Sequence, residues 1–110
     1  MTARENFPAL FLLCNLYLWE DMDTEYDNVY LAAAGMLKDN RLSDAIRVAG
    51  EIERLFETTS SEAQRWVVMD DLHIGWIHEK PGELDSFLRY VHSLYRAAGE
   101  ARSQSDRRGV

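Results

Sequence analysis

Apolar side chains recur at helical spacing along most of this 110-residue chain, so the pattern predicts helices. The first expected helix is capped by Asn6, has Pro8 in its first turn and runs to about Trp19. Apolar residues surround it almost completely, which is typical of a buried central helix or of one whose second face is kept for a partner. A second helix is expected over residues 28–38, with Asp27 as its cap.

A third helix is expected after Ser43, a residue type that favours the N-cap position. Its buried face should consist of Ala45, Val48, Ala49, Ile52, Leu55 and Phe56. The charged positions that we expect to face outward are Asp44, Arg47, Glu51 and Arg54. A polar break at residues 58–61 then precedes a shorter fourth helix, which Ser60 or Ser61 should cap. The apolar positions of this fourth helix are Ala63, Trp66, Val67 and Met69.

Residues 72–78 show no clear period, which predicts an irregular connection, with a short strand as the alternative. A turn at residues 80–82 precedes a fifth helix, and Gly99 is expected to end it. Its core positions are Leu84, Phe87, Leu88, Val91, Leu94, Tyr95 and Ala98. Residues 100–110 almost lack apolar side chains and are expected to form a flexible tail. The pattern therefore predicts an all-α fold, a compact single-domain bundle of about five helices within residues 1–99.

Charge and composition indicate which binding partners and which cellular compartment the chain favours. A formal net charge of -7 disfavours binding to nucleic acid or to an anionic membrane, and it favours a basic protein partner. The single cysteine, Cys14, cannot form an internal disulfide, which fits a reducing compartment. The apolar run at residues 9–19 falls short of the roughly 17 to 25 residues that span a bilayer, and it leads into acids rather than a cleavage site. We therefore expect a cytoplasmic protein.

An acidic segment lies between Trp19 and Asn28, where no basic residue occurs. Its five acids are Glu20, Asp21, Asp23, Glu25 and Asp27. Clustered charge of one sign repels itself and steers the encounter with an opposite charge, which indicates a docking surface. The alternative is a solvated helix connection made of good turn and cap residues. The expected partner surface also includes Asp70, Asp71 and Trp76; the tryptophan is either an interface anchor or a core residue over the fifth helix.

Candidate catalytic and metal-binding groups are scattered along the chain. The three histidines are His73, His78 and His92, and no two have the spacing of a ligand pair. Asp70 and Asp71 beside His73 could form a metal or general-base site, but adjacent aspartates near a helix end are usually solvated in so acidic a chain. Cys14 lies in an apolar run and is expected to be buried and inert. We expect no catalytic site, no metal and no cofactor.

The N-terminal quarter carries a recognisable string of residues. It consists of Phe7, Pro8, Ala9 and Leu10, then Tyr17 and Leu18, then Asp21, Met22, Asp23, Thr24, Glu25 and Tyr26. This string resembles the opening motif of CdiI-type immunity proteins, which belong to bacterial contact-dependent growth inhibition systems. The resemblance implies a small all-helical cytoplasmic protein that binds a cognate toxin domain, often a nuclease, and has no active site of its own.

The hypothesis is therefore an immunity protein, not an enzyme, that neutralises a basic nuclease toxin such as an RNase or tRNase in a one-to-one complex. Nucleases must be basic to hold phosphate, so an acidic inhibitor meets them with complementary charge. One alternative is an acidic adaptor or regulatory subunit of a protein complex, which would have no toxin gene beside its own. Another is a small enzyme or metal protein, which would need the histidines to cluster.

Overall fold

The computed structural model describes residues 3–17, 29–39, 41–72 and 81–108, and the regular structure in these ranges is helical. The helices are α1 (Ala3–Asn6), α2 (Pro8–Leu16), α3 (Val29–Lys38), α4 (Leu42–Thr58), α5 (Glu62–Asp71) and α6 (Glu83–Arg108). The predicted all-α bundle is confirmed over these ranges. The connection expected at residues 72–78 lies outside the described residues after Leu72, as does the expected cap Asp27.

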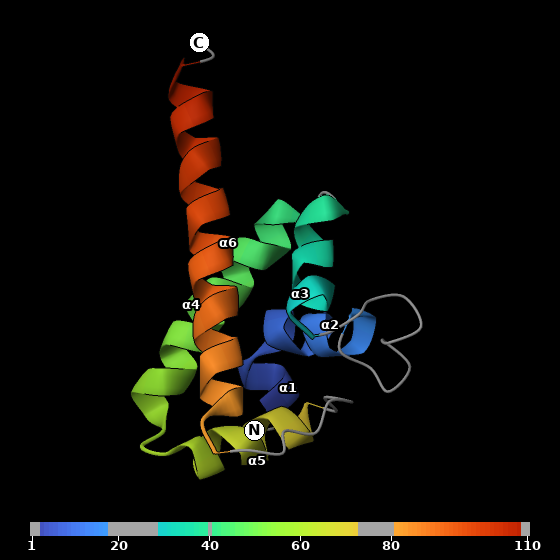
Figure 1. Cartoon of the computed structure of the whole chain (residues 1–110), viewed down its shortest axis with the longest axis vertical. Coiled ribbons are helices and arrows are strands. Elements are labelled where there is room, and N and C mark those ends of the chain that lie inside the picture. Colours follow the sequence, from blue (N-terminus) through green and yellow to red (C-terminus); the bar gives the residue numbers. More distant parts are fainter. Residues whose placement is uncertain (1–2, 18–28, 40, 73–80, 109–110) are drawn as a thin grey trace.

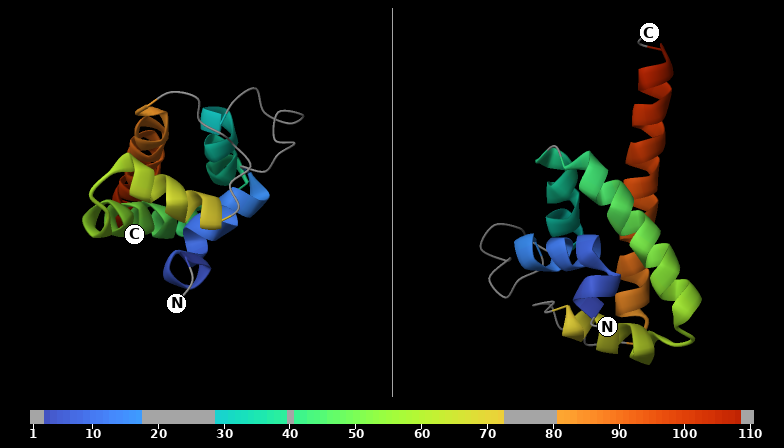
Figure 2. Two further views of the ribbon diagram at one scale, coloured as in Figure 1. Left: turned by 90° about the horizontal axis from the view of Figure 1, so that it is seen from below. Right: turned by 180° about the vertical axis from the view of Figure 1, so that it is seen from behind.

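Helix α4 is the centre of the bundle. It runs diagonally across α6 and packs along it, and it also contacts α2 and α3 (Figure 1). Helix α3 packs on α6, and α5 closes one end of the bundle, where it contacts α1 and α6 (Figure 2). The core that these helices share includes fully buried side chains from five of them, among them Leu13, Met36, Ile52, Met69, Phe87 and Leu88.

The start of α2 is capped by a residue of another helix. Asn6 ends α1, and Phe7 in the N-cap position of α2 makes no side-chain cap, so the expected Asn6 cap is wrong. The carboxylate of Glu51 in α4 accepts hydrogen bonds from the backbone N–H groups of Ala9 at 3.0 Å and Leu10 at 2.9 Å. Glu51 is 8% exposed, so the expectation that it faces outward is also wrong. A buried helix start needs acceptors for its free amides, and Glu51 supplies both.

The starts of α4 and α5 differ in how well the sequence predicts them. Helix α4 begins at Leu42 with Arg41 in the N-cap position and no side-chain cap, so Ser43 is not the cap. Helix α5 begins as expected, because the Ser61 Oγ accepts a hydrogen bond from the backbone N–H of Gln64 at 3.2 Å. The preference of serine for the N-cap position therefore predicts the start of α5, where Ser61 precedes the first turn, but not the start of α4, where Ser43 lies inside the helix.

Helix α5 buries a charged residue and exposes an apolar one. Met69 is fully buried and Trp66 is partly buried against the core, but Val67 is 68% exposed. Arg65 is buried instead, and its guanidinium pairs with Asp85 of α6. This ion pair fastens α5 to the first turn of α6.

Helix α6 continues through Gly99 to Arg108, so the expectation that Gly99 ends the fifth helix is wrong. Its 26 residues correspond to a length of about 39 Å, and its C-terminal part projects beyond α3 and α4 in Figure 1. A Cβ atom at Gly99 would lie 3.1 Å from Cγ1 of Ile46 in α4. The small residue thus permits close approach of the two helices, and residues 100–108 of the expected tail are helical.

Candidate functional site

The structure describes two of the residues that the sequence assigns to the partner surface. Asp70 and Asp71 are the last two residues of α5, and both are exposed. We call them the α5 acidic pair. The other assigned residues, which lie outside the described ranges, are Glu20, Asp21, Asp23, Glu25, Asp27 and Trp76.

The α5 acidic pair stands at an electrostatically unfavourable place. The C-terminal end of a helix carries a partial negative charge, which favours cations rather than carboxylates. Helix α5 has no basic residue in its last turn, and neither Asp70 nor Asp71 forms an ion pair with a described residue. A cationic partner would therefore relieve repulsion here rather than compete with an existing contact.

Other acids of the bundle are already used by the fold. Glu62 of α5 accepts hydrogen bonds from the backbone N–H groups of Gly82 at 2.8 Å and Asp85 at 3.1 Å, at the start of α6. Asp85 in turn holds Arg65 through two hydrogen bonds of 2.6 and 2.7 Å. Because the Asp85 carboxylate accepts both bonds from the Arg65 guanidinium, it raises the pKa of Arg65. Such acids have little free charge to offer a partner.

A second charged cluster links α4 to α6. Arg96 of α6 donates a hydrogen bond to Glu53 of α4, and this bond lowers the pKa of the Glu53 carboxyl group. Nε2 of His92 lies 3.5 Å from the other Glu53 oxygen and is buried, but the contact does not have hydrogen-bond geometry. The negative charge of Glu53 is therefore balanced by Arg96 of α6, and also by His92 when the imidazole is protonated.

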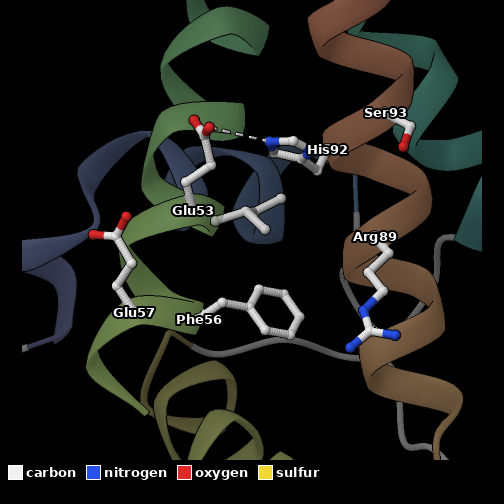
Figure 3. Close-up of a pocket in the computed structure, with 7 residues that line it drawn as sticks. Glu53, Phe56, Glu57, Arg89, His92 and Ser93 are labelled. Atoms are coloured by element: carbon white, nitrogen blue, oxygen red, sulfur yellow. Dashed lines mark ion pairs between the residues drawn. The ribbon is translucent and has the colours of Figure 1, made fainter.

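A groove lies beside this cluster, between α4 and α6, with a cavity volume of about 450 Å³. Its lining residues are Ile52, Glu53, Phe56, Glu57, Arg89, His92 and Ser93. Figure 3 shows the ring of Phe56 and the guanidinium of Arg89 facing each other across it, while the Glu57 carboxylate points away from α6. The Arg89 guanidinium carbon is 5.6 Å from the centre of the Phe56 ring. The groove thus combines an apolar wall with one cation.

The described residues offer little for nucleophilic or metal chemistry. Cys14 is fully buried, and burial raises the pKa of its thiol to about 12, so it stays protonated at neutral pH. Among the described residues, no three His, Cys, Asp or Glu side chains come together in a way that could hold a metal ion. His92 lines the groove, whereas His73 and His78 lie outside the described ranges.

Two features of the site are not predicted by the sequence. The groove arises from how α4 lies against α6, so the helical pattern assigns no role to Glu53 or Arg89, and His92 is predicted only as one of three scattered histidines. The capping role of Glu51 depends on a contact 41 and 42 residues away along the chain. The signal in the sequence that could have indicated this role is the position of the Glu51 carboxylate, on the apolar side of α4.

No helix in the described parts of the chain is both long and apolar enough to cross a membrane. Comparisons of the chain with protein families, with curated proteins and with solved structures found no match.

Proposed function

We propose that this protein is an immunity protein of the CdiI type, which binds a basic bacterial toxin domain one-to-one in the cytoplasm and neutralises it. The toxin class that fits best is a nuclease, such as an RNase or tRNase. The observation that carries the proposal is the α5 acidic pair, Asp70 and Asp71, which lies at the negative end of its helix and forms no ion pair with a described residue.

The acidic segment supports the same interpretation from the sequence. It places five carboxylates in residues 20–27 without a basic residue, in a chain whose net charge is -7. A nuclease holds its substrate with lysines and arginines, so such a surface attracts it over long range and raises the association rate. The resemblance of residues 7–26 to CdiI-type proteins connects this charge to toxin neutralisation.

In this proposal the protein inhibits the toxin by covering its cationic surface, and it catalyses no reaction. The carboxylates stand where substrate phosphates would otherwise lie, or beside that site. Because both partners are charged, the association rate should fall as salt is added, while the apolar contacts that hold the complex should depend on salt less strongly.

The test is coexpression with the toxin that we expect to be encoded beside this gene, a large secreted protein with a variable basic C-terminal domain. Expression of that toxin domain alone should stop bacterial growth. Coexpression of this protein should restore growth, and the purified pair should elute as a one-to-one complex. A non-cognate CdiI-type protein serves as the control and should not restore growth.

Two results would contradict the proposal. One is a neighbouring basic toxin domain that this protein neither binds nor neutralises. The other is a gene neighbourhood without any toxin, combined with stable recovery of this protein in a multiprotein complex, which would favour an acidic adaptor or regulatory subunit.

A further inference from the structure

The groove between α4 and α6 has the dimensions and the mixed lining of a small-molecule site. Its volume of about 450 Å³ lies in the range of roughly 300 to 1,000 Å³ that is usual for ligand pockets. Ile52 and Phe56 supply its apolar lining, and the guanidinium of Arg89 on α6 faces Phe56 (Figure 3). Such pockets commonly bind a largely apolar ligand and orient it with a few polar groups.

We propose that this groove binds a small aromatic carboxylate. The guanidinium of Arg89 swings away from the Phe56 ring, where it lies 5.6 Å from the ring centre, and pairs with the carboxylate. The aromatic ring of the ligand then packs on Phe56 and Ile52. This site is separate from the acidic surface described above, and the inference stands whether or not the protein neutralises a toxin.

The charge of the groove favours an anion. Arg89 forms no ion pair with a described residue, so its planar fork is free to bind a carboxylate through two parallel hydrogen bonds. The carboxylate of Glu53 is occupied by Arg96, and that of Glu57 points away from α6. The uncompensated charge that faces the cavity is therefore positive.

The aromatic wall is held in place before a ligand arrives. The guanidinium of Arg65 lies 4.5 Å from the centre of the Phe56 ring, and Arg65 is itself fixed by Asp85. A ring that is already positioned loses little freedom when a second ring packs against it, which favours aromatic ligands over flexible aliphatic ones.

The test is a titration of the full-length ¹⁵N-labelled protein followed by NMR. The probes are 3-phenylpropionate, its neutral amide 3-phenylpropanamide, and the cation 3-phenylpropylamine. The carboxylate should give saturable shifts of backbone amides in residues 52–57 and 89–93, with a Kd on the order of 1 mM for so small a ligand. The amide and the amine should bind about tenfold or more weakly, because they cannot pair with Arg89.

Three single variants locate the site. Arg89→Gln should weaken binding of the carboxylate about tenfold or more, and Glu57→Gln should leave it unchanged or strengthen it slightly. Arg47→Gln is the matched control, because Arg47 is an exposed arginine of α4 that does not line the groove. It changes the net charge as Arg89→Gln does and should leave the Kd unchanged. Thermal unfolding of each variant confirms that it is folded.

A peptide distinguishes two sources of the same chemical group. If Gly-Gly-Phe binds with a free C-terminus and not as its amide, the natural ligand is a chain terminus. If neither peptide binds while 3-phenylpropionate does, the natural ligand is a free acid.

The proposal is overturned if the carboxylate gives no saturable shift up to about 10 mM, ten times the expected Kd. It is also overturned if the amide, or the Arg89→Gln variant, binds equally well.

Discussion

Glu51 illustrates how much a single charged side chain can contribute when it serves another helix. Its carboxylate lies on the positive end of α2 and accepts the N–H groups of Ala9 and Leu10, which Phe7 in the N-cap position leaves unbonded. Hydrogen bonds to a charged group are stronger than those between neutral groups, and the burial of this contact makes it costly to remove.

We expect Glu51→Ala to lower the free energy of unfolding by about 2–3 kcal/mol, because two buried amides lose their acceptor. Urea denaturation measures the change. Glu57→Ala in the same helix removes the same charge from an exposed position and should cost less than about 0.5 kcal/mol. Equal losses in the two variants would show that the Glu51 contacts do not stabilise α2.

Cys14 leads to a prediction about alkaline pH. Burial raises the pKa of its thiol from 9.0 to about 12, and burial also raises the pKa of Tyr95. Below pH 9 the thiol is neutral in both the folded and unfolded states, and above pH 9 only the unfolded state ionises readily. The free energy of unfolding should therefore fall as pH rises from 9 towards 12.

The same burial should protect the thiol from reagents. At pH 8 we expect a disulfide reagent to label Cys14 in the folded protein about 100-fold or more slowly than in urea-unfolded protein, because labelling requires local or global opening. Rapid labelling of the folded protein would contradict the buried position of Cys14.

The central pair of helices, α4 and α6, makes the most extensive helix–helix contact in the described part of the bundle. Leu88 and Val91 of α6 are fully buried in the core, and Gly99 permits α6 to approach Ile46 of α4 closely. Gly50 lies in the middle of α4, yet a Cβ atom there would meet no atom within 4 Å. These positions allow packing and backbone effects to be measured separately.

We expect Leu88→Ala or Val91→Ala to lower the free energy of unfolding by about 2–4 kcal/mol, the usual cost of truncating a buried side chain. Denaturant unfolding with unchanged slope checks this. Losses below about 0.5 kcal/mol at both positions, a value typical of surface sites, would contradict the packing of α6 in the core.

Two glycine-to-alanine substitutions should change the free energy of unfolding in opposite directions. Gly50→Ala should raise the free energy of unfolding by about 0.5–1 kcal/mol, because alanine favours a helix interior and the space is open. Gly82→Ala should lower it by about 1 kcal/mol or more, since Gly82 has a φ of 87° that a Cβ atom disfavours. A stability change of the same sign in both variants would be inconsistent with the backbone described here.

At the scale of the whole molecule, the acids of the described ranges divide into those that make structural contacts and those that are exposed without such a contact. Glu51 caps α2, Glu62 binds the start of α6 and Glu53 pairs with Arg96, so a change at any of them would also remove a contact between helices. Asp70 and Asp71 make no such contact with described residues. Comparisons of surface charge must therefore use exposed acids without a structural role.

We expect Asp70→Asn with Asp71→Asn to slow association with the cognate toxin by about threefold or more at low salt, and by less at high salt. Stopped-flow kinetics at two salt concentrations measures this. The matched control changes Glu57 and Glu100 to glutamine, which removes two charges from exposed positions away from the α5 acidic pair. If both double variants associate at the same rate, net charge alone controls the encounter and the pair is not part of the interface.

The sequence alone predicted the helical class, the apolar stripes of α4 and α6, the cap at Ser61 and the buried state of Cys14. These follow from local rules, because helical spacing, turn residues and capping act within a few positions of one another. The same local rules failed at Gly99, where packing against Ile46 and not termination explains the glycine.

The roles of Glu51, Arg65 and the groove required the tertiary arrangement. Glu51 finds its partners 41 and 42 residues away, and Arg65 meets Asp85 20 residues along the chain. The groove exists because Phe56 on α4 and Arg89 on α6 are brought face to face by the crossing of the two helices. A periodic pattern shows which face of a helix is polar, but the partner of each charge depends on the register and angle at which helices pack, and these are set by the whole core.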